Sequence, residues 1–102
     1  MSSDLGFAYD PLETLELTEA YMRWPIPEPP AETEAHVVYE RATRGDIAAV
    51  TELASAYHFG RRGVAHDYQL AFQLYQRAAH AGDVRAMWLL GGMYAGGYPT
   101  LP

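Results

Sequence analysis

The chain has 102 residues and a formal net charge of −6, so it has room for one domain and lacks the basic surface that general nucleic-acid binding requires. Nearly half of its residues are apolar and a fifth are charged, which is typical of a folded domain and excludes disorder over most of its length. It has no cysteine, which excludes disulfides and cysteine-ligated zinc, so packing must supply its stability.

The N-terminal stretch 1–10 has neither the basic nor the apolar segment of a secretory signal, and no window reaches the ~20 apolar residues of a membrane span. We therefore expect a cytoplasmic protein without a membrane-spanning helix. Nine acidic residues and one arginine precede residue 41, whereas six arginines and four acidic residues follow. The acidic part is either a solvated helix face or a charged docking surface.

The first predicted helix covers residues 10–24. Asp10 is a candidate N-cap, Pro11 suits the first helical position and Glu13 completes a capping box. The apolar stripe that follows ends at Trp24, and we expect this helix to cap one end of the remaining structure. Prolines between residues 25 and 30 then exclude a helix and predict a stiff connector.

Four further helices are predicted from their start and stop signals, over residues 31–44, 46–59, 67–81 and 83–95. The last three begin at aspartates that can cap the first turn, and all four end before a glycine. No segment alternates with the period of two that a strand requires. The sequence therefore predicts an all-α protein of five helices.

The region after residue 40 repeats itself at an offset of 37 residues. The positions that recur are Ala42 as Ala79, Gly45-Asp46 as Gly82-Asp83, Ala49 as Ala86, Leu53 as Leu90, Tyr57 as Tyr94 and Gly60 as Gly97. A period of this size is typical of a helical-repeat solenoid, in which helix pairs bury their apolar faces against their neighbours. Small residues at Ala71, Ala78, Ala79, Ala86, Gly91 and Gly92 predict close helix contacts, with Tyr57, Tyr75 and Tyr94 filling the space between the helix pairs.

The second copy of the repeat closely resembles the Sel-1-like repeat, a relative of the tetratricopeptide repeat. The positions that carry the resemblance are Tyr75, Ala78, Ala79, Gly82, Ala86, Leu90, Gly91, Tyr94 and Gly97, with the joining loop Gly60, Gly63, Val64, Asp67 and Ala71. The resemblance covers about residues 38–97 and implies paired antiparallel helices in a right-handed superhelix, an α-α superhelix of two repeats. It further implies a role as an adaptor or scaffold for other proteins.

We divide the chain into an acidic N-terminal segment, 1–30, and two repeats, 31–66 and 67–102. The first repeat departs from the family pattern, since Val38 and Arg41 replace its tyrosine and first alanine. The third unit begins at Gly97 and breaks at Pro99.

Catalysis and metal or cofactor binding have weak support in the sequence. The four histidines His36, His58, His66 and His80 form no metal-ligand pair, and the repeat alignment places each on a helix exterior or in a loop. Ser55 lies mid-helix without a nucleophile motif, and no phosphate-binding loop is present. We therefore expect no catalytic, cofactor-binding or metal-binding residue, and no enzyme activity.

Candidate partner-binding residues lie on the helix over 67–81 and in the loop before it. Tyr68, Phe72, Gln73 and Gln76 are predicted to be exposed, because the family alanines and Tyr75 point inward. Aromatic and amide side chains suit the capture of a peptide or helix. Arg61 and Arg62 could meet an anionic group of a partner or form only a solvated loop tip.

The last helix and tail form an uncharged region, since Arg85 is the last charged residue. We expect an open apolar face centred on Trp88 and Met93, covered by a second copy of the chain or by a partner protein, unless the tail folds back over it. The function that follows is a cytoplasmic protein-binding module of bacterial type, in a narrower version an immunity protein against a toxin or effector. The alternative is a fragment or oligomer-forming structural piece of a longer solenoid with no ligand of its own.

Overall fold

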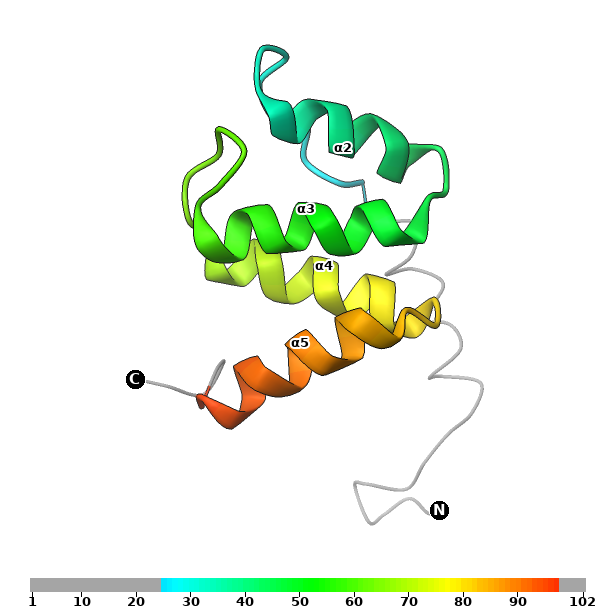
Figure 1. The fold of residues 1–102 in the computed structure, drawn as a ribbon, viewed down its shortest axis with the longest axis vertical. Helices are drawn as coiled ribbons and strands as arrows, with labels where there is room; N and C mark the ends of the chain where they lie inside the picture. The colour runs from blue at the N-terminus through cyan, green and yellow to red at the C-terminus, as the bar shows by residue number, and fades with distance from the viewer. Residues whose placement is uncertain (1–24, 98–102) are drawn as a thin grey trace, which may run out of the picture.

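The computed structural model describes residues 25–97. Their helices are α2 (Glu34–Thr43), α3 (Ile47–Phe59), α4 (Tyr68–His80) and α5 (Val84–Ala95). Figure 1 shows these helices stacked in chain order, and each packs mainly on its neighbours in sequence. No strand occurs in this range, which confirms the all-α repeat fold. The predicted helix over 10–24 and its capping role lie outside the described residues.

Three of the four helices begin where the sequence predicts. The carboxylates of Asp46, Asp67 and Asp83 accept hydrogen bonds from backbone N–H groups in the first turns of α3, α4 and α5. These bonds satisfy donors that have no partner inside the helix and therefore set the first helical residue. The predicted boundaries of these three helices agree with the structure to within one residue.

The start of α2 differs from the prediction, because α2 begins at Glu34 and not at Ala31. Thr33 is its N-cap: the Thr33 Oγ1 accepts from the His36 N–H at 3.2 Å and donates to the Pro30 carbonyl at 2.7 Å. This cap was not predicted, because Glu32 and Glu34, on either side of Thr33, favour an earlier first turn. The prolines exclude a helix up to Pro30, and a turn closed by the hydrogen bond from the Thr33 N–H to the Pro30 carbonyl, at 3.0 Å, leads into α2.

The loop between α3 and α4 fastens α2 to the repeat. The Ala35 N–H donates to the Arg62 carbonyl at 2.9 Å, and the Asp67 N–H donates to the Tyr57 carbonyl at 2.9 Å. Gly63 lies against Thr33, with so little room that a Cβ at Gly63 would stand 3.0 Å from the Thr33 side chain. The start of α2 and the end of α3 are therefore tied together by one short segment.

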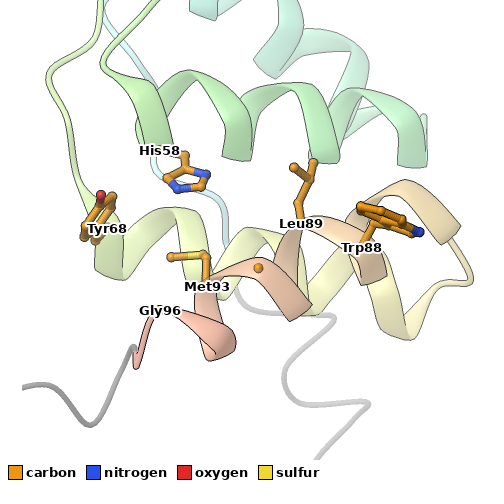
Figure 2. A pocket seen from close by; sticks show the side chains of 7 residues that line it. His58, Tyr68, Trp88, Leu89, Met93 and Gly96 are labelled. Atoms are coloured by element: carbon orange, nitrogen blue, oxygen red, sulfur yellow. The ribbon is translucent and has the colours of Figure 1, made fainter.

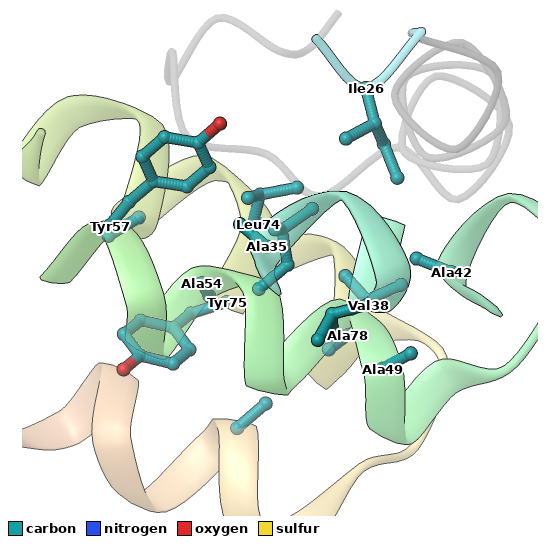
Figure 3. Close-up of a cluster of buried hydrophobic side chains, with 14 of the residues drawn as sticks. Ile26, Ala35, Val38, Ala42, Ala49, Ala54, Tyr57, Leu74, Tyr75 and Ala78 are labelled. Carbon is teal, nitrogen blue, oxygen red and sulfur yellow. The ribbon is translucent and has the colours of Figure 1, made fainter. Parts of the chain in front are cut away.

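The core combines alanines with larger apolar side chains in nearly equal numbers (Figure 3). Its members come from all four helices and the connector: Ile26, Ala35, Val38, Ala42, Ala49, Val50, Leu53, Ala54, Tyr57, Ala71, Leu74, Tyr75, Ala78, Ala86 and Met93. Small residues let the helix axes approach closely, and Leu53, Leu74 and Tyr75 fill the remaining volume. Ile26 shows that the proline-rich connector also packs on this core, although it was predicted only to be a stiff connector.

Two predictions about packing are wrong at the C-terminal end. Tyr57 and Tyr75 are buried as expected, but Tyr94 is 52% exposed and makes an edge-to-face contact with Phe72. Gly91 and Gly92 do not sit against a neighbouring helix, because a Cβ at either would meet nothing within 4 Å. The reason is the same for both: within the described residues α5 packs on α4 and has no helix following it.

Candidate binding groove

An apolar groove of about 440 Å³ lies where the end of α3, the start of α4 and one side of α5 meet. It is lined by His58, Tyr68, Trp88, Leu89, Gly92, Met93 and Gly96. Figure 2 shows Tyr68 and Trp88 toward opposite ends, with Met93 between them. The structure thus brings together Tyr68, Trp88 and Met93, three of the eight partner-binding candidates predicted from the sequence.

His58 forms the polar wall of the groove. Its Nδ1 lies 3.1 Å from the Tyr75 hydroxyl, its ring stacks on Phe59 at 4.2 Å, and Tyr68 meets it edge-on at 5.4 Å. This histidine was predicted to lie on a helix exterior, and it packs at the surface, where aromatic side chains from α4 half-bury it. An imidazole held in this way is fixed in position and leaves its second nitrogen, Nε2, as the polar group for a ligand.

The protonation states at this wall follow from burial. Desolvation lowers the pKa of His58, and repulsion from His66 lowers it further. Burial raises the pKa of Tyr75, although a hydrogen bond from Ser55 and the charge of Arg85 act in the opposite direction. At neutral pH both rings are therefore uncharged, and the wall carries no net charge.

Trp88 and Met93 occupy different environments, which corrects the prediction of one open face centred on both. Trp88 is 80% exposed, whereas Met93 is 6% exposed and belongs to the core. The two residues are five positions apart, which is about 140° around a helix, so they cannot share a face. Trp88 is the exposed rim of the groove and Met93 is part of its floor.

The other candidates on α4 divide between two places. Phe72, Gln73 and Gln76 are half-buried. Gln76 lines a second groove of about 300 Å³ between α4 and α5, whose other lining residues are Ala79, His80, Met87, Leu90 and Tyr94. Phe72 contacts Tyr94 at its edge, and Gln73 lines neither groove. Of the four candidates on α4, only Tyr68 therefore lies in the larger groove.

The two loop arginines are engaged within the protein. The Arg61 guanidinium lies 4.7 Å from the centre of the Phe59 ring. The Arg62 guanidinium lies 3.7 Å from Glu34 and 3.9 Å from Glu52, and Glu52 also pairs with Arg41 at 3.1 Å. A partner's anionic group would have to compete with these glutamates for Arg62.

The groove suits binding more than chemistry. Its surface combines aromatic and aliphatic groups with one neutral imidazole, as in pockets that accept an apolar side chain. Across residues 25–97, no three His, Cys, Asp or Glu side chains are placed to hold a metal ion. Of the helices in the same range, none has both the length and the apolar character needed to cross a bilayer.

His58 and Leu89 are the groove residues that sequence reasoning missed. No local pattern marks His58, because the tyrosines that surround it, Tyr68 and Tyr75, come from the next helix. Leu89 precedes the repeat position Leu90 and was not distinguished from the other apolar residues of its helix. Trp88 was found because a large side chain stands in an uncharged stretch with no predicted neighbour.

Comparison with known proteins agrees with this geometry. Residues 47–83 and 84–102 each match the Sel1 repeat, so the first match spans α3 and α4, the pair of helices with the most extensive packing. The chain is also similar to the ERAD-associated E3 ubiquitin-protein ligase component HRD3A of Arabidopsis thaliana, with 35% identity over 57 residues. That alignment covers 56% of this chain and 8% of the relative. No solved structure is significantly similar. Because the two repeat matches cover more than half of its length, the chain belongs to the Sel1 repeat family.

Proposed function

We propose that this protein is an interaction module that binds an apolar segment of another protein in the groove lined by His58, Tyr68, Trp88 and Met93. The observation that carries the proposal is the groove itself, about 440 Å³ with Trp88 80% exposed at its rim. Sel1 repeats are in general non-catalytic protein-interaction modules, which supports this class of function.

The chemistry of the groove favours a segment that presents one or two large apolar side chains. Met93 is an unbranched, polarisable floor that adapts to different shapes, and Tyr68 and Trp88 offer wide aromatic faces. Exposed aromatic residues around a pocket are the type that dominates binding energy in protein interfaces. His58 Nε2 can accept or donate one hydrogen bond and so fix the orientation of the bound segment.

A matched pair of tyrosine variants tests the groove. Tyr68 and Tyr94 are similarly exposed, at 46% and 52%, but Tyr68 lines the larger groove and Tyr94 the smaller one. Peptides are selected on the parent from a random peptide library, and their affinities for Tyr68→Ala and Tyr94→Ala are measured by calorimetry. We expect Tyr68→Ala to weaken binding about tenfold or more and Tyr94→Ala to leave it within about twofold. Equal losses, or a larger loss for Tyr94→Ala, would contradict the proposal.

The narrower version is a bacterial regulator or immunity protein that neutralises a toxin or effector in the cytoplasm. Its support is the small size and the net charge of −6. A cognate toxin that binds at the groove would lose affinity for the Tyr68→Ala variant in the same way as the selected peptides. A toxin that binds this variant as tightly as it binds the parent would show that the immunity function does not use the groove.

A further inference from the structure

The internal repeat allows α5 to be compared with α3 position by position. Four positions that are buried in α3 are open in α5: Val50, Thr51, Ala54 and Tyr57 in α3 correspond to Met87, Trp88, Gly91 and Tyr94 in α5. In α3 these residues lie between α2 and α4, with exposures of 9% or less. The α5 positions have only α4 beside them within the described residues. One side of α5 therefore has the composition of a covered helix face without a cover.

Met87 and Tyr94 line the smaller groove beside α4, and the rest of the open side of α5 forms one continuous stripe, which we call the α5 stripe. It consists of Val84, Arg85, Trp88, Gly91, Gly92 and Ala95, all of them exposed. The N-terminal half of the stripe carries the large side chains and the C-terminal half carries two glycines and an alanine. The spacing of three and four residues keeps all six on one side of the helix.

We propose that a second copy of this chain covers the α5 stripe, with the two α5 helices packed antiparallel about a twofold axis. An axis near residue 90 places Trp88 of each copy opposite Gly91 and Gly92 of the other, and Val84 and Arg85 opposite Ala95. Large residues then meet small ones along the whole stripe, which is the self-complementarity that a twofold interface requires. A parallel arrangement would set Trp88 against Trp88 and leave the glycines facing each other.

Gly91 and Gly92 make this fit physically specific. A Cβ at either position would meet nothing within 4 Å inside the monomer, so no contact within residues 25–97 requires these glycines. A mid-helix glycine is unfavourable relative to alanine. In the antiparallel pair the two glycines leave the backbone without a Cβ, so the indole of Trp88 from the other copy can pack directly on it.

The charges of the stripe agree with the same orientation. Arg85 lies in the first turn of α5, and the antiparallel pair sets it beside the last turn of the other α5. The carbonyl groups and the negative end of the helix dipole at that turn attract a guanidinium. The charge of Arg85 acts on Tyr75, but no ion pair joins the Arg85 side chain to another residue within the described range.

The size of the surface predicts a weak dimer. Burying Trp88 removes on the order of 200 Å² from water, and the whole stripe on the order of 400 Å² per copy. A total on the order of 800 Å² is below the ~1,200 Å² of stable interfaces, so we expect a weak dimer that dissociates on dilution. Trp88 and Gly92 belong to both the groove and the α5 stripe, but Tyr68 and His58 lie outside the stripe, so variants at these two residues test the groove separately.

The first experiment measures mass against concentration by sedimentation equilibrium on the full chain. We expect the 11.3 kDa chain to reach twice that mass at high micromolar concentration, and Gly91→Glu to raise the dissociation constant at least tenfold. Val37→Glu is the matched control, since Val37 is 58% exposed on α2 and far from the stripe in the stack. A monomeric parent up to about 1 mM, or equal effects of the two glutamates, would overturn the proposal. Tyr68→Ala should leave the dimer intact.

The second experiment tests the orientation of the two helices. The chain has no cysteine, so only the introduced cysteines can form a disulfide. In the antiparallel pair, residues 85 and 95 of the two copies lie side by side, whereas residue 95 is about 15 Å along the axis from residue 95 of the other copy. A tagged Arg85→Cys chain mixed with an untagged Ala95→Cys chain should therefore form the mixed disulfide, and Ala95→Cys alone should not crosslink. Rapid crosslinking of Ala95→Cys alone, without the mixed product, would show a parallel pair and overturn the orientation.

Discussion

Two alanine substitutions at glycines should change stability in opposite directions. Gly63 has φ of 89°, and a Cβ there would stand 3.0 Å from the Thr33 side chain. The left-handed backbone costs an alanine ~1–2 kcal/mol, and displacing the cap of α2 costs a further ~1 kcal/mol. Gly91→Ala meets open space in a helix and should stabilise by ~1 kcal/mol.

These free energies translate into large differences in melting temperature. At about 4–8 °C per kcal/mol, Gly63→Ala should melt roughly 10–20 °C below the parent and Gly91→Ala roughly 5 °C above it. Circular dichroism at a low micromolar concentration, where the chain should be monomeric, measures both. Gly45→Ala separates strain from crowding, because Gly45 has φ of 98° but no atom near the position of its Cβ. Gly45→Ala should therefore lower the free energy of unfolding only by the cost of the left-handed backbone. A Gly63→Ala melting point no lower than that of Gly45→Ala would refute the steric part of the argument.

Three further predictions concern single polar groups. Thr51→Val removes the 2.5 Å hydrogen bond from Oγ1 to the Asp83 carboxylate and should lower the free energy of unfolding by about 1–2 kcal/mol in urea titrations. Arg41→Met removes the hydrogen bonds that chiefly hold the pKa of Asp46 below 3.8, so a carboxyl titration by NMR should show that pKa rising. The pKa of His58 is lowered below 6.5, so its contribution to stability is present above that pH and is lost as the pH falls through the folded-state pKa. The melting temperature of His58→Gln should therefore fall less than that of the parent between about pH 7.5 and about pH 5.

The helices could be predicted because their signals are local. An aspartate that caps a first turn and a glycine that ends a last turn act within a few residues, so α3, α4 and α5 follow from the sequence. The 37-residue offset then predicts how the helices stack. The start of α2 failed because its cap, Thr33, depends on a turn set by Pro30 and not on a helical pattern.

The candidate site could be predicted less well, because its residues meet across helices. Periodicity places Tyr68 and Trp88 on exposed faces, but it does not show that they border one groove. No sequence pattern predicts the burial of Ile26, because a single apolar residue between prolines is buried only through its contacts with the folded core. The separation of Met93 from Trp88, by contrast, follows from helix geometry and could have been worked out from their spacing.

The stacking of each helix mainly on its sequence neighbours determines how the protein should open. Within residues 25–97 the extensive contacts join only consecutive helices, so local stability is set by how many neighbours a helix has. Amide hydrogen exchange should therefore be slowest in α3 and α4, which have a helix on each side, and faster in α5. Binding at the free side of α5 would give it a second neighbour and slow its exchange toward that of α3. The rate of amide hydrogen exchange in α5 therefore reports whether a partner covers this helix.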